Sequence, residues 1–256
     1  MLLEQLDLTG LIALAAVMAF SGLVHGTLGL GFPLVSTPLI ALMVDVRTAI
    51  LLTLLPTVAV NVASIIGGKG YGDSLKRFWP LAVSALLSAM LGAWLLAWVD
   101  PHPFKLILAL LILLFLWATY TQRVPTAFMA CFPVTAMLVF GVASGFAAGT
   151  TNVMVAVLII YFLAIDLPRP TMVPIMNTCF GAGKIAQLIV LSVAGLVSWS
   201  LVIHTLPLAV IAVGALTVGQ RLSQRIPVAT YKRVLHALLA VMAALLIYQF
   251  ATGLTF

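Results

Sequence analysis

The sequence predicts an all-α polytopic membrane protein, and three observations lead to this prediction. Hydrophobic residues make up 64% of the 256 residues, the mean hydropathy is +1.26, and only 7% of residues are charged. A water-soluble domain of this composition would leave too little polar surface for solvent. The apolar residues form continuous runs, whereas a transmembrane β-barrel needs alternation. The net charge of +6 lies in short loops, which fits the positive-inside rule better than a nucleic-acid-binding surface.

Short polar loops separate eight apolar segments, so we expect one membrane domain. The segments cover residues 8–43, 48–66, 78–99, 106–120, 127–165, 171–197, 200–219 and 234–252. Six of them fit one crossing each, but the first and fifth are too long. As one helix, residues 8–43 would be roughly 54 Å long, against roughly 30 Å of bilayer hydrocarbon. Both long segments must therefore break.

Glycine and proline mark the expected break in the first long segment. Gly29, Gly31 and Pro33 lie in its middle and favour a helix interruption there. Unpaired backbone groups at membrane depth are tolerated only where they line a cavity or meet a ligand. We therefore interpret the break as part of a binding site made of backbone.

The second long segment carries a comparable stretch between Phe140 and Asn152. A polar triplet follows Gly149, and we match it with Gly31, Phe32 and Pro33 of the first half; the triplet is Thr150, Thr151 and Asn152. Polar residues in the middle of an apolar segment are hard to explain by packing. The glycines four residues apart, in contrast, are typical of helix packing; they are Gly22 and Gly26, and Gly141 and Gly145.

The distribution of Lys and Arg favours helical hairpins for the long segments. If every segment crossed once, four loop cations would lie on one side and seven on the other. If each long segment folds back, nine lie on one side: Lys69, Lys76, Arg77, Arg123, Arg169, Arg221, Arg225, Lys232 and Arg233. Only Arg47 and Lys105 lie on the other. The stronger bias predicts that the side with nine is cytoplasmic and that both termini are non-cytoplasmic.

Hairpins also predict two inverted repeats, residues 1–122 and 123–256. Each half then has an odd number of crossings, a glycine-broken hairpin plus three transmembrane helices, so similar halves would be oppositely oriented. The order of segment lengths recurs, and Asp45-Val46-Arg47-Thr48 is echoed by Asp166-Leu167-Pro168-Arg169. Inverted repeats with broken helices near the midplane are typical of secondary transporters.

The polar residues within the segments indicate an anion. Lys184 is the only Lys or Arg deep in an apolar segment, and no Asp or Glu lies at that depth. Asn177, Lys184 and Gln187 follow one helix face, and Asn61 belongs to a similar polar stripe in the first half. His25 lies one turn before the first break and is the titratable candidate of that region. A cation pathway would normally contain a carboxylate. We therefore expect a neutral to positive central cavity.

The glycine pattern resembles that of the TauE/SafE-type permeases, also called the toluene sulfonate uptake permease family. Their signature is similar to G-x-x-x-G-x-x-G-x-G-G-G with a later proline; here Gly22, Gly26, Gly29, Gly31 and Pro38 match it, and Phe32 and Pro33 replace its last two glycines. In the second half Gly141 and Gly145 match, and the following positions depart, namely Ala148, Thr150, Thr151, Asn152 and Val157. The resemblance implies an inner-membrane transporter of sulfite, sulfonates or related small sulfur-containing anions.

The predicted function is therefore alternating-access transport of a small sulfur-containing anion such as sulfite, thiosulfate or a sulfonate. The predicted substrate-binding residues are His25, Gly29, Gly31, Pro33, Asn61, Gly149, Thr150, Thr151, Asn152, Asn177, Lys184 and Gln187. The alternatives are a permease for another small organic anion or carboxylate, and a non-transporting helper subunit. We expect no cofactor, no metal and no catalytic residue, because nucleotide-binding, H-E-x-x-H and G-x-S-x-G motifs are missing from the sequence. The expected partners are the anion, the lipid bilayer and a possible second copy of the chain, without nucleic acid.

Overall fold

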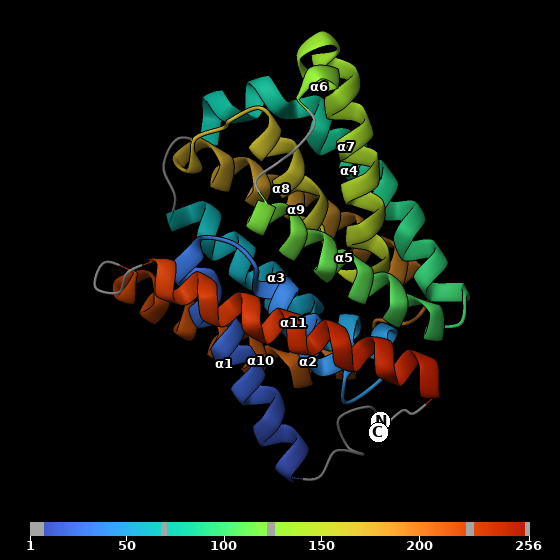
Figure 1. The fold of residues 1–256 in the computed structure, drawn as a ribbon. Helices are drawn as coiled ribbons and strands as arrows, with labels where there is room; N and C mark the ends of the chain where they lie inside the picture. The colour runs from blue at the N-terminus through green and yellow to red at the C-terminus, as the bar shows by residue number, and fades with distance from the viewer. Residues whose placement is uncertain (1–7, 68–70, 122–125, 224–227, 254–256) are drawn as a thin grey trace.

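The computed structural model describes residues 8–67, 71–121, 126–223 and 228–253, and helices form nearly all of these ranges (Figure 1). No strand occurs within them. The helices are α1 (Leu8–Leu28), α2 (Phe32–Ala41), α3 (Val46–Gly67), α4 (Tyr71–Trp98), α5 (His102–Thr121), α6 (Ala127–Cys131), α7 (Pro133–Thr151), α8 (Val155–Ala164), α9 (Arg169–Val193), α10 (Trp199–Leu222) and α11 (Val228–Thr252). Eight of these are long and apolar enough to cross a membrane. The predicted all-α polytopic class is confirmed.

Both long segments break where the sequence predicts a break. In the first, Gly29 and Gly31 adopt left-handed conformations with φ of +78° and +102°, and α2 begins at Phe32. Glycine accepts positive φ without steric cost. In the second, α7 ends at Thr151, and Asn152, which follows it, has a φ of +69°. The helices that follow, α2 and α8, have 10 residues each and are about 15 Å long, half of the hydrocarbon thickness.

Contacts between helix termini define the two ends of the bundle. At the end that we call the Arg169 end, Arg169 at the start of α9 donates to the carbonyl of Leu28 at the end of α1. Thr119 near the end of α5 contacts His236 near the start of α11 there as well.

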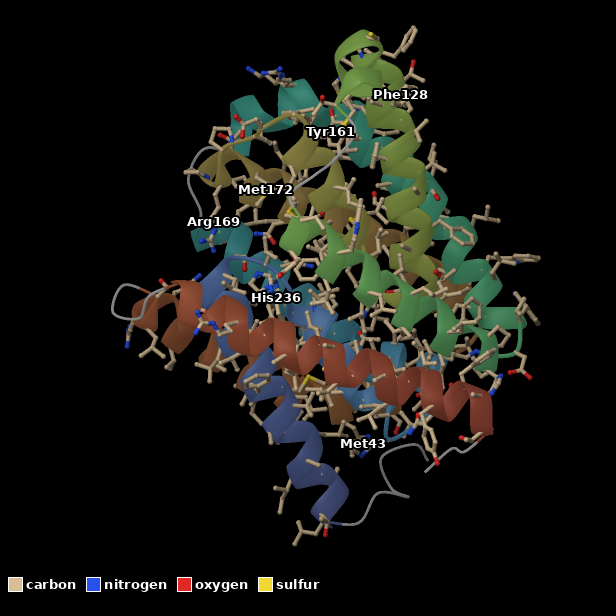
Figure 2. All side chains as sticks on the ribbon, in the orientation of Figure 1. Met43, Phe128, Tyr161, Arg169, Met172 and His236 are labelled. Carbon is tan, nitrogen blue, oxygen red and sulfur yellow. The ribbon has the colours of Figure 1, made fainter. Side chains whose placement is uncertain are left out.

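At the opposite end, the Arg47 end, Arg47 near the start of α3 donates to the carbonyls of Leu96 and Val99 at the end of α4. Gln249 near the end of α11 donates to Leu42 O, just after α2. Figure 2 labels Met43 and Arg169, which lie far apart at these two ends.

Each long segment therefore folds back on itself. The first reaches the Arg169 end with α1, and α2 returns toward the Arg47 end. The second starts at the Arg169 end, where Pro133 lines one pocket with Asp166 and Pro168, and α8 returns to that same end. The described cations outside the membrane core divide unequally: Lys76, Arg77, Arg169, Arg221 and Arg233 lie toward the Arg169 end, against Arg47 and Lys105 at the other. Lys69, Arg123, Arg225 and the side chain of Lys232 lie outside the described residues.

Glycines hold two pairs of helices in close parallel contact. A Cβ on Gly22 would lie 2.4 Å from Ala212 O, and one on Gly26 would lie 2.2 Å from Leu216 O, so α1 packs directly on the α10 backbone. Gly145 of α7 packs in the same way on Ala85 of α4. The predicted packing role of these glycines is confirmed.

The helix pairs are exchanged between the halves. When the five-residue helix α6 is left out of the count, the first helix of each half packs on the fourth helix of the other, as α1 with α10 and α7 with α4. The third helices follow the same rule, since α3 contacts α10 and α9 contacts α4. Figure 1 shows α5 and α11 side by side, and these are the last helices of the two halves.

The α4–α7 contact yields a stability prediction. A Cβ at position 145 would lie 2.1 Å from Ala85 O, so Gly145→Ala should lower the free energy of unfolding by about 2 kcal/mol through overpacking. Gly214→Ala is the matched control, because Gly214 is exposed in α10 and a methyl group added there would meet no heavy atom within 4 Å. Thermal unfolding of the purified protein in detergent measures both. Equal effects of the two substitutions would contradict the close contact.

Candidate functional site

The first break is held by His25, which is 2% exposed. Its Nδ1 accepts the N–H of Phe32, the first residue of α2, at 3.2 Å. Its Nε2 lies 3.0 Å from Ser64 Oγ in α3, and that hydroxyl donates to Val60 O. Nδ1 accepts a hydrogen bond from Phe32, and the Ser64 hydroxyl donates its proton to Val60 O. The hydrogen bond between Ser64 and His25 is therefore donated by Nε2, which carries the imidazole proton. His25 thus caps α2 and ties the break to α3.

The carbonyl groups released at the end of α1 are satisfied by α9. Asn177 Nδ2 donates to Gly29 O at 3.3 Å, and the Arg169 guanidinium donates to Leu28 O at 2.7 Å. Carbonyls at a helix end have no intrahelical donor, and in a membrane they require another one. The first break therefore depends on one polar face of α9.

The second break is organised by Asn152, which is fully buried. Its Nδ2 donates to Thr37 Oγ1 at 2.9 Å and to Thr53 Oγ1 at 3.2 Å. Its Oδ1 accepts from Lys184 Nζ. One side chain thus joins α2 and α3 of the first half to α9 of the second.

The Lys184 ammonium is 3% exposed and has only neutral partners in the described part of the chain. It donates to Asn152 Oδ1 and to Gln187 Oε1. Gln187 in turn donates to Ala148 O at 3.3 Å and to Gly149 O at 3.1 Å, two carbonyls near the end of α7. Amide oxygens solvate an ammonium but do not cancel its charge. When protonated, Lys184 has no carboxylate partner among the described residues, so an anion would complement its charge.

The two breaks are built alike, in a register that the sequence comparison missed. Asn152 is the first residue after α7, Gly29 is the first after α1, and both are left-handed, so the helix ends match Asn152 with Gly29 and not with Pro33. The sequence match of Thr150–Asn152 with Gly31–Pro33 was therefore wrong. A similar position within a polar stretch does not show which residue ends the helix.

The predicted site residues fall into two clusters. Asn177 serves the first break and Lys184 the second, and they lie two turns apart on α9, roughly 10 Å along its axis. The first cluster contains His25, Gly29, Gly31 and Asn177, and Pro33 is buried beside it in the first turn of α2. The second contains Gly149, Asn152, Lys184 and Gln187.

Three predicted residues make no contact across the clusters. Thr150 and Thr151 donate to Phe146 O and Ala147 O of their own helix, both at 2.8 Å. Asn61 is buried in α3, and its Nδ2 has no hydrogen-bond partner, which leaves a free donor inside the bundle. Thr37 and Arg169 were not predicted as site residues. Arg169 was counted only as a loop cation, although its match with Arg47 in the repeated sequence could have indicated a role.

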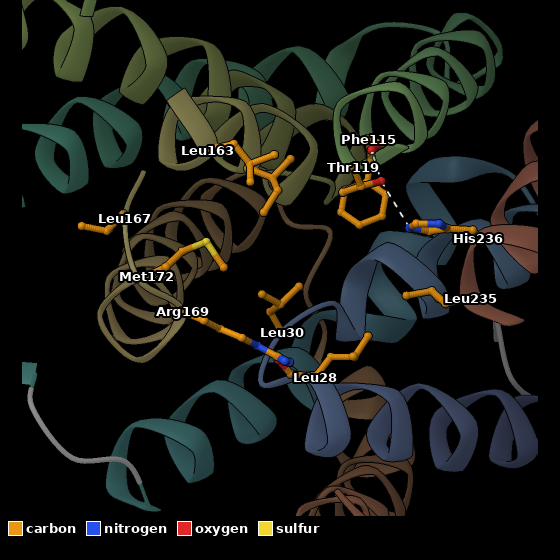
Figure 3. A pocket seen from close by; sticks show the side chains of 11 residues that line it. Leu28, Leu30, Phe115, Thr119, Leu163, Leu167, Arg169, Met172, Leu235 and His236 are labelled. Atoms are coloured by element: carbon orange, nitrogen blue, oxygen red, sulfur yellow. Dashed lines mark hydrogen bonds between the residues drawn. The ribbon is translucent and has the colours of Figure 1, made fainter. Parts of the chain in front are cut away.

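Two pockets open at the Arg169 end. One of about 250 Å³ is shown in Figure 3 and is lined by Leu28, Leu30, Phe115, Thr119, Ile159, Leu163, Leu167, Arg169, Met172, Leu235 and His236. It reaches the first break, since Leu28 and Leu30 flank Gly29. The second, of about 440 Å³, lies at the starts of α4 and α7. Neither is lined by Lys184 or Asn152. A single central cavity shared by both breaks stays a prediction.

Eight helices long and apolar enough to cross a membrane, two half-length helices and a buried lysine with no carboxylate partner among the described residues define a class: a multi-pass membrane protein built like a transporter. The described residues contain no group of three or more His, Cys, Asp or Glu side chains that could hold a metal ion.

Residues 14–246 match the model of the sulfite exporter TauE/SafE family. The match covers nearly the whole chain, and the protein belongs to this family of membrane transporters, which is not a family of enzymes. Comparisons with curated proteins and with solved structures found no match.

Asn152 allows conformation and hydrogen bonding to be tested separately. Asn152→Gly keeps the left-handed conformation but removes one of the two acceptors of Lys184 and the donor to two threonine hydroxyls, and we expect a loss of about 2 kcal/mol in unfolding free energy. Asn152→Ala should lose about 1 kcal/mol more, because alanine is strained at positive φ. Thermal or denaturant unfolding of both variants measures the difference. An alanine variant as stable as the glycine variant would contradict the left-handed conformation.

Proposed function

We propose that the protein is a secondary transporter that moves a small sulfur-containing anion, such as sulfite, thiosulfate or a sulfonate, across the inner membrane. The observation that carries the proposal is the buried Lys184 ammonium, whose described partners are neutral amide oxygens. Burying an ammonium costs about 2.5–3.5 kcal/mol on insertion scales. Binding of an anion would offset that cost, and the family membership agrees with an anionic substrate.

The groups around Lys184 suit an oxyanion. The Asn152 Nδ2 group, which donates to two threonine hydroxyls in the structure, is a donor that can turn to an arriving anion. We propose that the anion takes the place of Asn152 Oδ1 or Gln187 Oε1 beside the ammonium. An oxyanion gains more from a charged donor than a neutral amide oxygen does.

We further propose alternating access between two inverted repeats, residues 1–122 and 123–256. Two features support it. Helix pairs are exchanged between the halves, as two repeats related by a twofold rotation would require. The matched arginines also hold different partners: Arg47 binds the end of α4 within its own half, whereas Arg169 binds the end of α1 in the other half. In the opposite state of the transport cycle, Arg47 would bind a helix end of the other half, and Arg169 would bind a helix end of its own half. The positive-inside rule places the Arg169 end toward the cytoplasm and the termini outside it.

A flux assay with a panel of anions tests the transport function. Purified protein in liposomes should accelerate movement of radiolabelled sulfite, thiosulfate or a sulfonate over protein-free liposomes. The same panel should include short carboxylates, because a carboxylate-only response would assign the chain to another organic anion. Absence of flux for every anion in the panel would favour a non-transporting helper subunit and overturn the proposal.

The role of Lys184 is tested by Lys184→Ala. Loss of a charge-assisted hydrogen bond of about 1.5–3 kcal/mol should weaken the apparent anion affinity in the flux assay by roughly tenfold or more. Lys105→Ala is the matched control, since Lys105 is another buried lysine with an amide partner, Gln249, but lies at the Arg47 end away from both breaks. Unchanged affinity and rate in Lys184→Ala, with normal insertion, would remove Lys184 from the site.

A further inference from the structure

The pocket of Figure 3 combines an apolar wall with one permanent charge. Ends of α1, α5, α8, α9 and α11 meet there, and eight of its eleven lining residues are apolar. Leu163 and Met172 face Leu30 across the space, as the figure shows. A hydrocarbon group placed between these side chains would be removed from water on several sides.

Arg169 supplies the charge of the pocket. Its described hydrogen bond goes to Leu28 O, a neutral acceptor, and uses one of five guanidinium N–H donors. A guanidinium binds the planar edge of a carboxylate, or two oxygens of a sulfonate, with two parallel hydrogen bonds. The pocket therefore has a fixed place for an anionic headgroup at its edge.

The other polar side chains of the pocket are already engaged with each other. The Thr119 hydroxyl donates to Phe115 O at 2.7 Å and lies 3.2 Å from His236 Nε2, the contact drawn as a dashed line in Figure 3. Because the hydroxyl proton is already donated to Phe115 O, the hydroxyl oxygen can accept a hydrogen bond from the Nε2–H group of His236. Recognition of a negative charge in this pocket thus falls to Arg169.

These features separate two kinds of anion. A small, strongly hydrated inorganic anion would give up its water for one guanidinium and a wall of leucines, which is unfavourable. An anion with a hydrocarbon body gains from the same wall. The volume of about 250 Å³ is enough for a short chain or single ring but not for the chains of a phospholipid.

We infer that this pocket binds an organic monoanion with a short hydrocarbon body, its carboxylate or sulfonate headgroup on Arg169 and its body against Leu30, Leu163 and Met172. Because Leu28 and Leu30 flank Gly29, the bound anion lies next to the first break, at the entrance from the Arg169 end. That the anion is also a transported substrate rests on the proposed function; the binding site itself does not.

Calorimetric titration of the full chain in lipid nanodiscs tests the site. The probes are hexanesulfonate and hexanoate, with methanesulfonate and sulfite as anions lacking the body and hexyltrimethylammonium as a cation that has it. We expect the two hexyl anions to bind at least about tenfold more tightly than the other three, because only they use both the wall and the charge. Equal binding of methanesulfonate and hexanesulfonate would overturn the role of the wall, and tighter binding of the hexyl cation would overturn the role of Arg169.

Variants connect this binding to the pocket. Arg169→Ala should weaken hexanesulfonate binding by about tenfold, and Leu163→Trp should weaken it similarly by filling the space while Arg169 remains. Arg221→Ala is the matched control, an exposed arginine at the same end outside the pocket, and should bind as the parent does. If neither Arg169→Ala nor Leu163→Trp changes binding, the anion binds elsewhere and the assignment is overturned.

Two further measurements separate the possible failures. Hexadecanoate that binds more tightly than hexanoate, with the same dependence on Leu163, would identify a membrane lipid site and overturn the short-chain ligand. Flux in liposomes distinguishes the site from transport. Hexanesulfonate binding without flux of any anion would support the binding pocket and overturn the proposed function. Sulfite flux without hexanesulfonate binding would support the proposed function and overturn the binding pocket.

Discussion

The structure depends on one constraint: peptide groups released inside a membrane must find partners within the protein. Two helices stop within the bundle, and each stop exposes carbonyl and N–H groups that water cannot reach. At the first stop the partners are His25, Asn177 and Arg169, and at the second Gln187 donates to the carbonyls of Ala148 and Gly149. Polar residues on α9 contribute to both. This explains why α9 carries a polar face although it is long enough to cross the bilayer.

The second consequence of the breaks is electrostatic. Lys184 lies among the polar groups of the second break, where an ammonium can be solvated by amide oxygens without a carboxylate. A carboxylate partner would have neutralised the site and made it a structural ion pair. The described surroundings instead keep the cation solvated and uncompensated. Under the proposed function, an anion could approach this ammonium without first displacing a carboxylate from it.

Much of this fold follows from the sequence, because segment length against bilayer thickness is a strong constraint. It forced breaks near Gly29 and Gly31, and glycine spacing predicted the close contact at Gly22 and Gly26. The half-length of α2 and α8 did not follow, since the apolar run continues without a signal up to Asp45 and Asp166. Nor did the role of Asn152 follow, because its left-handed conformation and its contacts with Thr37 and Thr53 depend on tertiary packing. In the sequence, Thr150 and Thr151 resembled ligand-binding residues. In the structure, their hydroxyls donate to carbonyls of their own helix, α7, which the sequence pattern does not reveal.

The side chain of Asn152 has a mechanical consequence. Its amide nitrogen holds elements of the first half, and its oxygen holds the ammonium of the second, so it works as a clasp between the two halves of the chain. The first half has only Gly29 at the matching place and therefore no such clasp. Opening at the Asn152 side would have to undo this clasp of side chains, whereas opening at the Gly29 side would have to break the hydrogen bonds that Asn177 and Arg169 donate to backbone carbonyls. Under the proposed alternating access, the two movements would therefore break different kinds of hydrogen bond, and their energetic barriers need not be equal.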